Sequence, residues 1–406
     1  MRVRLPEKWE ETPASKKTSP ADRLPWINLA ALALAGFLAI MAEAVPAGLL
    51  IPIGADLRIS KGGAGQLVTA YALGSLLCAI PIMRAASAWD RKKLLMLGMF
   101  VLSAANAVTA LSSSYAVILA ARFCAGVAAA LLWGMLAGYT RFMVAEHLRG
   151  RALAVAMSGT PLALAFGVPL GTFIGGLWGW RAVFGIISLI ALLLAAWISR
   201  KFASVPGQPS NAPLSLRQAF VTPGVRPILI TVVAWMLAHN ILYTYIAPYL
   251  ALSGLDGRVD RLLLLFGSCA ILGIWLIGIG IDRRLRQLVL SSLAGFALSA
   301  LALGIWSDRP VVVSVAIAAW GITFGGAATL LQTAAAEAAG SAVDLVQAML
   351  VTAWNLAIGS GGVVGALLLQ TGGAERLPTV CVLVALGGLL TAATARTHGF
   401  PLRSKG

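Results

Sequence analysis

Three ionisable side chains lie inside long apolar stretches of the chain: Glu43, Arg122 and His239. A charged side chain in the middle of a membrane-spanning helix costs about 3 kcal/mol, so residues of this kind mark candidate functional sites. Counted at about 1.5 Å per residue along the predicted helices, Glu43 and Arg122 fall at a similar depth. We therefore predict that Glu43 binds and releases a proton and that Arg122 acts with it. The alternative is a permanent structural pair, or a bond from either side chain to the backbone.

His239 belongs to a polar face within an otherwise apolar stretch. Asn240 follows it directly, and Tyr243 lies four residues further on, where helical residues are neighbours. Together with aromatic residues that could stack on a planar ligand, this face predicts a substrate cavity. Packing within the helix bundle is the alternative role for these side chains. The predicted cavity residues are His239, Asn240, Tyr243, Tyr245, Trp133, Trp354 and Asn355.

Membrane-spanning helices are the elements that must position these residues. The 406 residues are 59% hydrophobic and only 11% charged, with a mean hydropathy of +0.88, whereas soluble domains are about 25% charged. A spanning helix needs about 20 predominantly apolar residues. Twelve such runs occur, at residues 26–50, 64–83, 94–112, 115–138, 152–178, 182–200, 227–250, 262–281, 288–305, 311–331, 343–371 and 378–395.

A polar, proline-containing segment after the sixth run divides the chain into two halves. Each half has a basic loop after its second run, beginning at Asp90 and at Asp282. We predict an all-α polytopic membrane protein of 12 transmembrane helices, arranged as two six-helix bundles with pseudo-two-fold symmetry. The predicted parts are a cytoplasmic tail (1–25), an N-terminal bundle (26–200), a cytoplasmic linker (201–226), a C-terminal bundle (227–396) and a second cytoplasmic tail (397–406).

The basic residues indicate how the chain is oriented in the membrane. With twelve helices, 23 of the 31 Lys and Arg residues fall on one side and seven on the other, and cytoplasmic loops carry the excess of positive charge. This predicts a protein of the cell inner (plasma) membrane with both termini in the cytoplasm. The net charge of +16 therefore reflects topology, because no basic cluster is large enough to bind nucleic acid.

Several segments carry recognisable motifs: 48–57 (GLLIPIGADL), 64–74 (AGQLVTAYALG), 121–126 (ARFCAG), 167–172 (GVPLGT), 179–181 (GWR) and 243–250 (YTYIAPYL). Together they resemble the major facilitator superfamily, in particular its twelve-helix drug:proton antiporters of the arabinose-efflux type, over about residues 26–396. The resemblance implies proton-driven export of a small molecule by alternating access. We further expect a monomer that is not an enzyme and needs no cofactor beyond the proton gradient.

The same resemblance implies gating roles for a Gly-Pro stretch in the fifth helix and for the two basic loops. It also implies that Arg122 tunes the carboxylate or holds water. In the first loop, Arg84 and Ala88 stand where the family has glycine and aspartate, so this loop matches less well than the second. The residues concerned are Gly167, Pro169, Gly171, Asp90, Arg91, Asp282, Arg283 and Arg284.

Other function classes lack their characteristic residues. A membrane enzyme would need a nucleophile–base pair, a metal set or clustered carboxylates, and neither HExxH nor Gly-x-Ser-x-Gly occurs. The phosphate-binding pattern GxxxxGK[ST] is also missing, and the four cysteines have no CxxC spacing that would suit zinc. Proton-coupled import of a small polar metabolite remains the alternative. The substrate of an exporter could be a drug, a sugar or a related metabolite.

Overall fold

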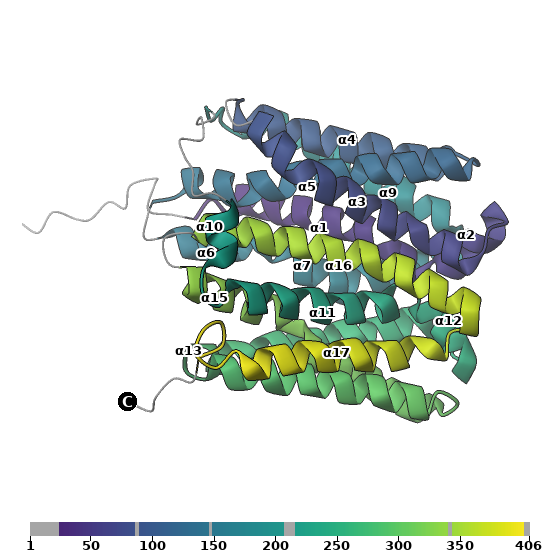
Figure 1. Ribbon diagram of the computed structural model, residues 1–406. Coiled ribbons are helices and arrows are strands. Elements are labelled where there is room, and N and C mark those ends of the chain that lie inside the picture. Colours follow the sequence, from purple (N-terminus) through teal and green to yellow (C-terminus); the bar gives the residue numbers. More distant parts are fainter. Residues whose placement is uncertain (1–23, 86–88, 146–147, 207–215, 340–342, 402–406) are drawn as a thin grey trace, which may run out of the picture.

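The computed structural model describes residues 24–85, 89–145, 148–206, 216–339 and 343–401. Within these ranges every regular element is a helix, and the long helices lie side by side (Figure 1). A helix satisfies its own backbone hydrogen bonds, which a chain must do to cross hydrocarbon. The all-α membrane fold predicted from the apolar runs is confirmed.

The N-terminal half, coloured purple to teal, occupies the upper part of Figure 1. Its helices are α1 (Trp26–Gly48), α2 (Leu50–Leu57), α3 (Lys61–Ala85), α4 (Arg91–Leu111), α5 (Tyr115–Met143), α6 (Arg149–Met157), α7 (Gly159–Leu162), the π-helical turn η3 (Ala163–Gly167), α8 (Val168–Trp178) and α9 (Trp180–Lys201).

The C-terminal half, green to yellow, occupies the lower part. Its helices are α10 (Leu216–Val221), α11 (Val225–Thr244), α12 (Ile246–Leu250), the 3₁₀ turns η4 (Ala251–Ser253) and η5 (Asp256–Arg258), α13 (Val259–Ile305), α14 (Pro310–Gly325), α15 (Ala327–Ala339), α16 (Val343–Gly372) and α17 (Arg376–Thr394).

All twelve predicted spans are helical. Among the described residues, eleven segments are long and apolar enough to cross a membrane. The twelfth, predicted at 64–83, is α3, whose 25 residues are long enough to span. Its glycines and polar side chains, such as Gln66 and Ser75, lower its hydropathy. α3 packs against both α5 and α16, so protein covers the faces that carry many of these residues.

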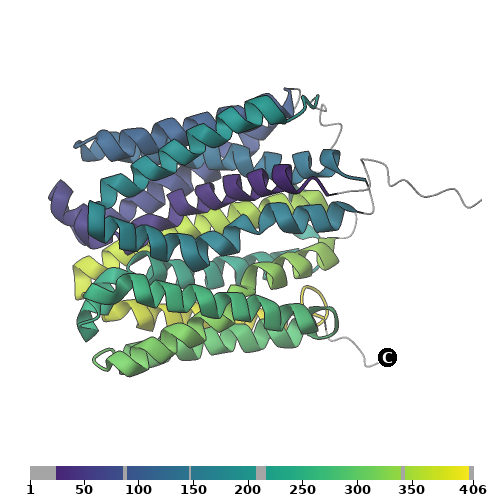
Figure 2. The same cartoon turned by 180° about the vertical axis from the view of Figure 1, so that it is seen from behind.

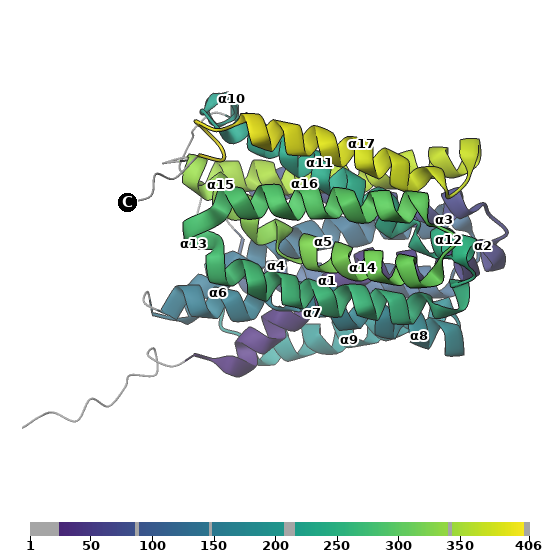
Figure 3. The same ribbon diagram turned by 90° about the horizontal axis from the view of Figure 1, so that it is seen from below.

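The region predicted as two helices, 262–281 and 288–305, forms one helical element, α13. The predicted loop between them reduces to Arg284, whose φ of −132° and ψ of 27° depart from helical geometry. The chain reverses there, and the two limbs of α13 lie antiparallel (Figure 3). Both predicted spans therefore exist, but the connection is shorter than the loop that the charged residues indicated.

We call α1–α9 the N-terminal bundle and α10–α17 the C-terminal bundle; Figures 1 and 2 show them on opposite sides of the molecule. They meet along two helix pairs, α3 with α16, and η3 and α8 with α13. At the second pair, a β-carbon added to Gly267 would overlap the backbone of Ala165, which lies in η3. A glycine is therefore required for this contact, where the backbones of the two bundles touch.

The two ends of the molecule differ in charge. The end at the left of Figure 1 carries α10 and the turn within α13 and is called the basic end; the other carries α2 and α12 and is called the opposite end. The first contains the basic residues at the turn of α13, Arg283, Arg284 and Arg286. α1 begins and α17 ends at the basic end. Of the predicted tails and linker, residues 1–23, 207–215 and 402–406 lie outside the described residues.

Candidate functional site

Arg122 on α5 is fully buried in the N-terminal bundle. Its Nε donates to the carbonyl oxygen of Leu67 on α3 at 3.4 Å, and its Nη2 donates to that of Ala42 on α1. Its Nη1 has no hydrogen-bond partner. The approach of α3 to α5 depends on Gly126, where a β-carbon would overlap the backbone carbonyl of Tyr71. Arg122 thus joins three helices and keeps one nitrogen available.

Glu43 follows Ala42 on α1, and its side chain is half-buried. It forms no hydrogen bond or ion pair with any residue that the structure describes. The carboxylate and Arg122 are close enough to interact electrostatically, without direct contact. The hydroxyl of Tyr71 does not bind the carboxylate, because it donates to the carbonyl of Ala39 at 2.8 Å. The structure therefore brings Glu43 and Arg122 together and leaves the carboxylate open to water or a ligand.

Aromatic side chains surround His239 in the C-terminal bundle. The imidazole stacks on Phe324, with ring centroids 3.6 Å apart and planes 4° from parallel. Trp320 donates its indole N–H to Nδ1 of His239 at 3.2 Å. The ring of Tyr243 stacks at 5.1 Å from His239, and its buried hydroxyl has no hydrogen-bond partner. We call His239, Tyr243, Phe266, Trp320 and Phe324 the aromatic cluster.

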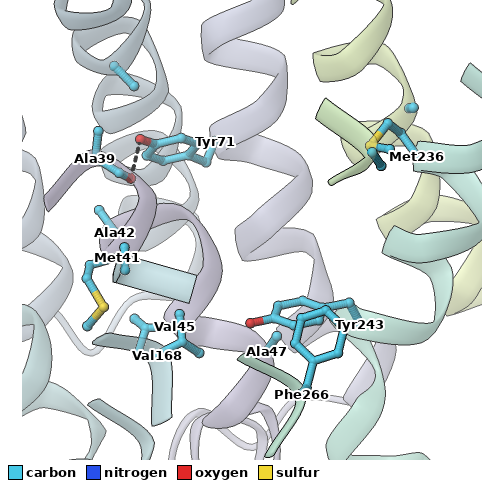
Figure 4. Packing of buried hydrophobic residues seen from close by; sticks show 14 of the residues in the cluster. Ala39, Met41, Ala42, Val45, Ala47, Tyr71, Val168, Met236, Tyr243 and Phe266 are labelled. Carbon is cyan, nitrogen blue, oxygen red and sulfur yellow. Dashed lines mark hydrogen bonds between the residues drawn. The ribbon is translucent and has the colours of Figure 1, made fainter. Parts of the chain in front are cut away.

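The aromatic cluster reaches the N-terminal bundle at α1. Figure 4 shows Tyr243 and Phe266 beside Ala47. Ala47 lies four residues after Glu43, and residues at this spacing share one face of a helix. The cluster and Glu43 are therefore about 6 Å apart along the axis of α1. They face the same region between the two bundles.

Four other residues that were predicted to line the cavity make contacts outside the aromatic cluster. Asn240 and Asn355 each donate a hydrogen bond, at 2.8 and 3.0 Å, to the carbonyl four residues earlier in the same helix. Trp133 on α5 packs against α1 at Gly36. Trp354 packs with residues of α3, where the two bundles meet. None of these contacts joins them to the aromatic cluster.

Tyr245 lies where the two bundles meet, towards the opposite end. It is fully buried, and its hydroxyl donates to the carbonyl of Gly362 on α16, within the C-terminal bundle, at 2.6 Å. From the N-terminal bundle, Gln66 on α3 donates to the same carbonyl at 3.3 Å, and Thr69 donates to that of Gly359 at 3.4 Å. Hydrogen bonds from α3 therefore close this half of the α3–α16 interface, and the Tyr245 ring packs against α3 at Gly65.

The glycines of the predicted Gly-Pro stretch face α1. Gly167, Pro169 and Gly171 are all buried, and β-carbons at the two glycines would press on Met41 and Val45. The stretch begins at the last residue of the π-helical turn η3, continues into α8 and packs against the helix that carries Glu43. Its observed role is therefore close helix packing beside the candidate site.

The first basic loop is bound to the start of the linker. Asp90 caps α4 by accepting from the backbone N–H of Lys93 at 3.0 Å, and it also accepts from the hydroxyl of Ser204. The backbone N–H of Arg91 donates to Val205 at 2.9 Å. Desolvation raises the pKa of the Asp90 carboxyl, but these hydrogen bonds outweigh it and hold the pKa below its usual value. Both residues thus attach the linker to α4.

The second basic loop turns α13. Arg283 and Arg284 are exposed at the basic end, and the side chain of Asp282 lies outside the description. Arg286, which we did not predict, donates to the carbonyls of Ala392 and Ala393 at 3.1 and 2.8 Å and so caps the end of α17. No group of three or more His, Cys, Asp or Glu residues in the described ranges could hold a metal ion.

Comparison with known proteins decides the family. Residues 32–366 match the sequence profile of the Major Facilitator Superfamily. The chain belongs to this superfamily. Its relatives include the purine ribonucleoside efflux pumps NepI of Salmonella paratyphi C, 32% identical over 304 residues, and of Salmonella paratyphi B, 31% identical over 303 residues. Each alignment covers 74% of this chain and 76% of the relative.

Solved structures share the superfamily fold. A bacterial homologue of the human lysosomal transporter Spinster, inward-facing and occupied, has a TM-score of 0.68 at 16% identity over 92% of this chain and 94% of its own. The inward-facing, unoccupied form has a TM-score of 0.64 at 15% identity over 93% and 97%. The chain is therefore a multi-pass membrane protein of a transporter superfamily.

Several residues of the candidate site were not predicted from the sequence. Phe266, Trp320 and Phe324 surround His239, and Tyr71 lies under Arg122. Trp320 and Phe324 are four residues apart, a spacing that puts two aromatic rings on one face of a helix. This spacing is visible in the sequence, but it does not specify which residue of another helix the two rings contact.

Proposed function

We propose that the protein exports a small molecule in exchange for protons, and that Glu43 carries the proton. The observation that supports this is a carboxylate that has no hydrogen-bond or ion-pair partner among the described residues and lies close enough to a fully buried arginine to interact with it electrostatically. Protonation removes the attraction between Glu43 and Arg122, while deprotonation restores it. A change of charge at a bundle interface can bias the equilibrium between two bundle arrangements.

We infer that the basic end faces the cytoplasm, that the membrane is the inner membrane and that the protein acts as a monomer. The positive-inside rule supports this orientation, because the excess of Lys and Arg lies at the basic end. Protons would then enter from the opposite end and leave at the basic end. Export moves the substrate in the reverse direction.

We propose purine ribonucleosides as the substrate class. Relatives at 31–32% identity are named as purine ribonucleoside efflux pumps, which supports this assignment. The aromatic cluster supports it independently, since its flat side chains and few polar atoms suit a planar heteroaromatic base. Drugs and sugars remain the other classes to be compared with purine ribonucleosides in the assay.

The experiment uses inside-out membrane vesicles with an acidified interior, in which export appears as uptake of radiolabelled adenosine. Glu43→Gln should reduce uptake driven by the pH gradient to the level of vesicles without the protein, because the amide cannot carry a proton. Adenosine counterflow, which needs no net proton movement, should persist and shows that the variant is folded. Glu375→Gln, at an exposed carboxylate, is the matched control and should behave like the parent protein.

Two results would contradict the proposal. Undiminished gradient-driven uptake by Glu43→Gln would remove Glu43 from the proton path. Adenosine accumulation in right-side-out vesicles in response to an inward proton gradient, without uptake in inside-out vesicles, would instead indicate import.

A further inference from the structure

The hydrogen bond between Trp320 and His239 specifies the protonation state of the imidazole. An indole N–H can only donate. Because Nδ1 of His239 receives this bond at 3.2 Å, Nδ1 must be unprotonated. A neutral imidazole with a bare Nδ1 carries its proton on Nε2. A histidinium would have a proton on both nitrogens and would lose the bond to Trp320.

The orientation of the His239 ring is fixed as well. Stacking on Phe324, at 3.6 Å and 4°, sets the ring plane. The bond from Trp320 then sets which edge of the ring points towards α14. With the plane and one edge defined, the Nε2–H points away from Trp320 in a single direction. The contacts that orient this side chain come from aromatic residues, with no charged partner among the residues that the structure describes.

Nε2 is the nitrogen that the protein leaves unused. It makes no hydrogen bond with a described residue, and it is not among the fully buried atoms that lack a partner, so a small part of the ring remains accessible. The hydroxyl of Tyr243, one turn further along α11, is buried without a partner. A buried hydroxyl without a partner requires an explanation. An accessible N–H without a partner lies one turn away on the same face of α11, and the two groups together point to a ligand.

We propose that His239 is a specificity-determining residue whose Nε2–H donates a hydrogen bond to an acceptor on the edge of a planar heteroaromatic substrate. Trp320 is the positioning residue that selects the required tautomer. This inference rests on the proposed function and deepens it. In a purine we assign this acceptor to N7, one of the ring nitrogens that adenine and guanine share. A site built to hydrogen-bond a substrate atom rejects analogues that lack that atom.

The test compares adenosine with 7-deazaadenosine, in which a C–H replaces N7. In the vesicle assay, each compound competes against radiolabelled adenosine, and the ratio of their inhibition constants is measured. We expect the parent protein to favour adenosine about tenfold, the value of one hydrogen bond between neutral groups. His239→Phe keeps a flat ring for stacking but has no donor, so its ratio should fall to about one. Trp320→Phe removes the donor to Nδ1, so both neutral tautomers of His239 become populated. The ratio should then fall about threefold.

Trp235→Phe is the matched control. Trp235 is also a fully buried tryptophan of the C-terminal bundle and lies edge-on to Phe324, but its Nε1 has no hydrogen-bond partner. Its variant should keep the parent ratio. A ratio does not depend on how much folded protein the vesicles contain, so weaker expression of any variant leaves the comparison valid.

Nitrogen NMR of ¹⁵N-histidine-labelled protein tests the tautomer without transport. His239→Phe identifies the His239 signals among the three histidines. We expect a bare Nδ1 and a protonated Nε2 in the parent protein, and a mixture in Trp320→Phe. A protonated Nδ1 in the parent would overturn the inference, as would an adenosine preference that His239→Phe leaves unchanged. Vesicles that move no purine ribonucleoside would refute the proposed substrate class and, with it, the N7 acceptor.

Discussion

The two bundles contribute opposite kinds of polar group to the region between them. The N-terminal bundle contributes Glu43 and Arg122, which are ionisable and incompletely partnered. The C-terminal bundle contributes His239, whose Nδ1 accepts a hydrogen bond from Trp320. A group that must change its protonation needs freedom from permanent hydrogen bonds, whereas a group that recognises a ligand atom needs a constant donor. In the roles proposed above, the two halves of one fold would separate energy coupling from recognition.

The largest effect that this comparison predicts is at Arg122. Arg122→Lys keeps the charge but loses the planar group that donates to Ala42 and Leu67. A hydrogen bond from a charged group contributes about 1.5–3 kcal/mol, so gradient-driven transport should fall about 10- to 150-fold, and the thermal midpoint in detergent should drop by several degrees. Uptake in vesicles and a fluorescence-detected melting curve measure the two quantities.

Arg261→Lys, at an exposed residue of the opposite end, is the control for that substitution. It should leave both measurements within error of the parent. Normal transport by Arg122→Lys would show that only the charge at this position matters, and the hydrogen bonds to α1 and α3 would then have no role in coupling.

An effect of intermediate size tests whether the two bundles have separate roles. If coupling and recognition are independent, Glu43→Gln should keep the preference for adenosine over 7-deazaadenosine in counterflow. His239→Phe should keep its dependence on the pH gradient while losing that preference. The double variant should combine both losses, with each quantity within about twofold of the corresponding single variant. A preference that disappears in Glu43→Gln would mean that both residues serve one function.

The smallest effect is expected outside the membrane-spanning part of the N-terminal bundle. Asp90→Ala removes the cap of α4 and should cost about 1 kcal/mol of stability, while Asp90→Asn retains a capping oxygen and should cost less. Since the folded-state pKa of Asp90 is lowered, the carboxylate stabilises the protein above the unfolded pKa. Its contribution should begin to decrease as the pH falls through the unfolded pKa of about 4 and should be lost as the pH falls further, through the lower folded-state pKa. Melting curves of the parent and of Asp90→Ala from pH 7 down to about pH 2 test this, and a difference between them that does not shrink below pH 4 would contradict it.

Much of the fold follows from local composition, because apolar runs of spanning length have few alternatives to a helix in lipid. The depths of Glu43 and Arg122 in the membrane could also be predicted, since depth can be counted along a helix. Contacts between distant helices could not be predicted. Trp320 lies 81 residues from His239, and no periodicity within one segment indicates which tryptophan reaches which histidine.

Hydrogen bonds to backbone carbonyls were also beyond sequence reasoning. Tyr245 was predicted to line a cavity because it is aromatic and near a polar face. It binds the carbonyl of Gly362, and every residue has such a carbonyl, so the identity of the residue does not reveal the partner. The turn at Arg284 within α13 was similarly hidden, because charged residues predict a connection but not its length.

The contact between Gly267 and Ala165 determines how motion would be shared between the two faces of the membrane. It places the backbones of the two bundles against each other in the interior of the interface. A rotation of about 20° around such a point displaces helix ends that lie about 15 Å away, half the thickness of the hydrocarbon core, by about 5 Å. The displacement has opposite sense at the two ends. Geometry alone would then ensure that widening at one membrane surface accompanies narrowing at the other.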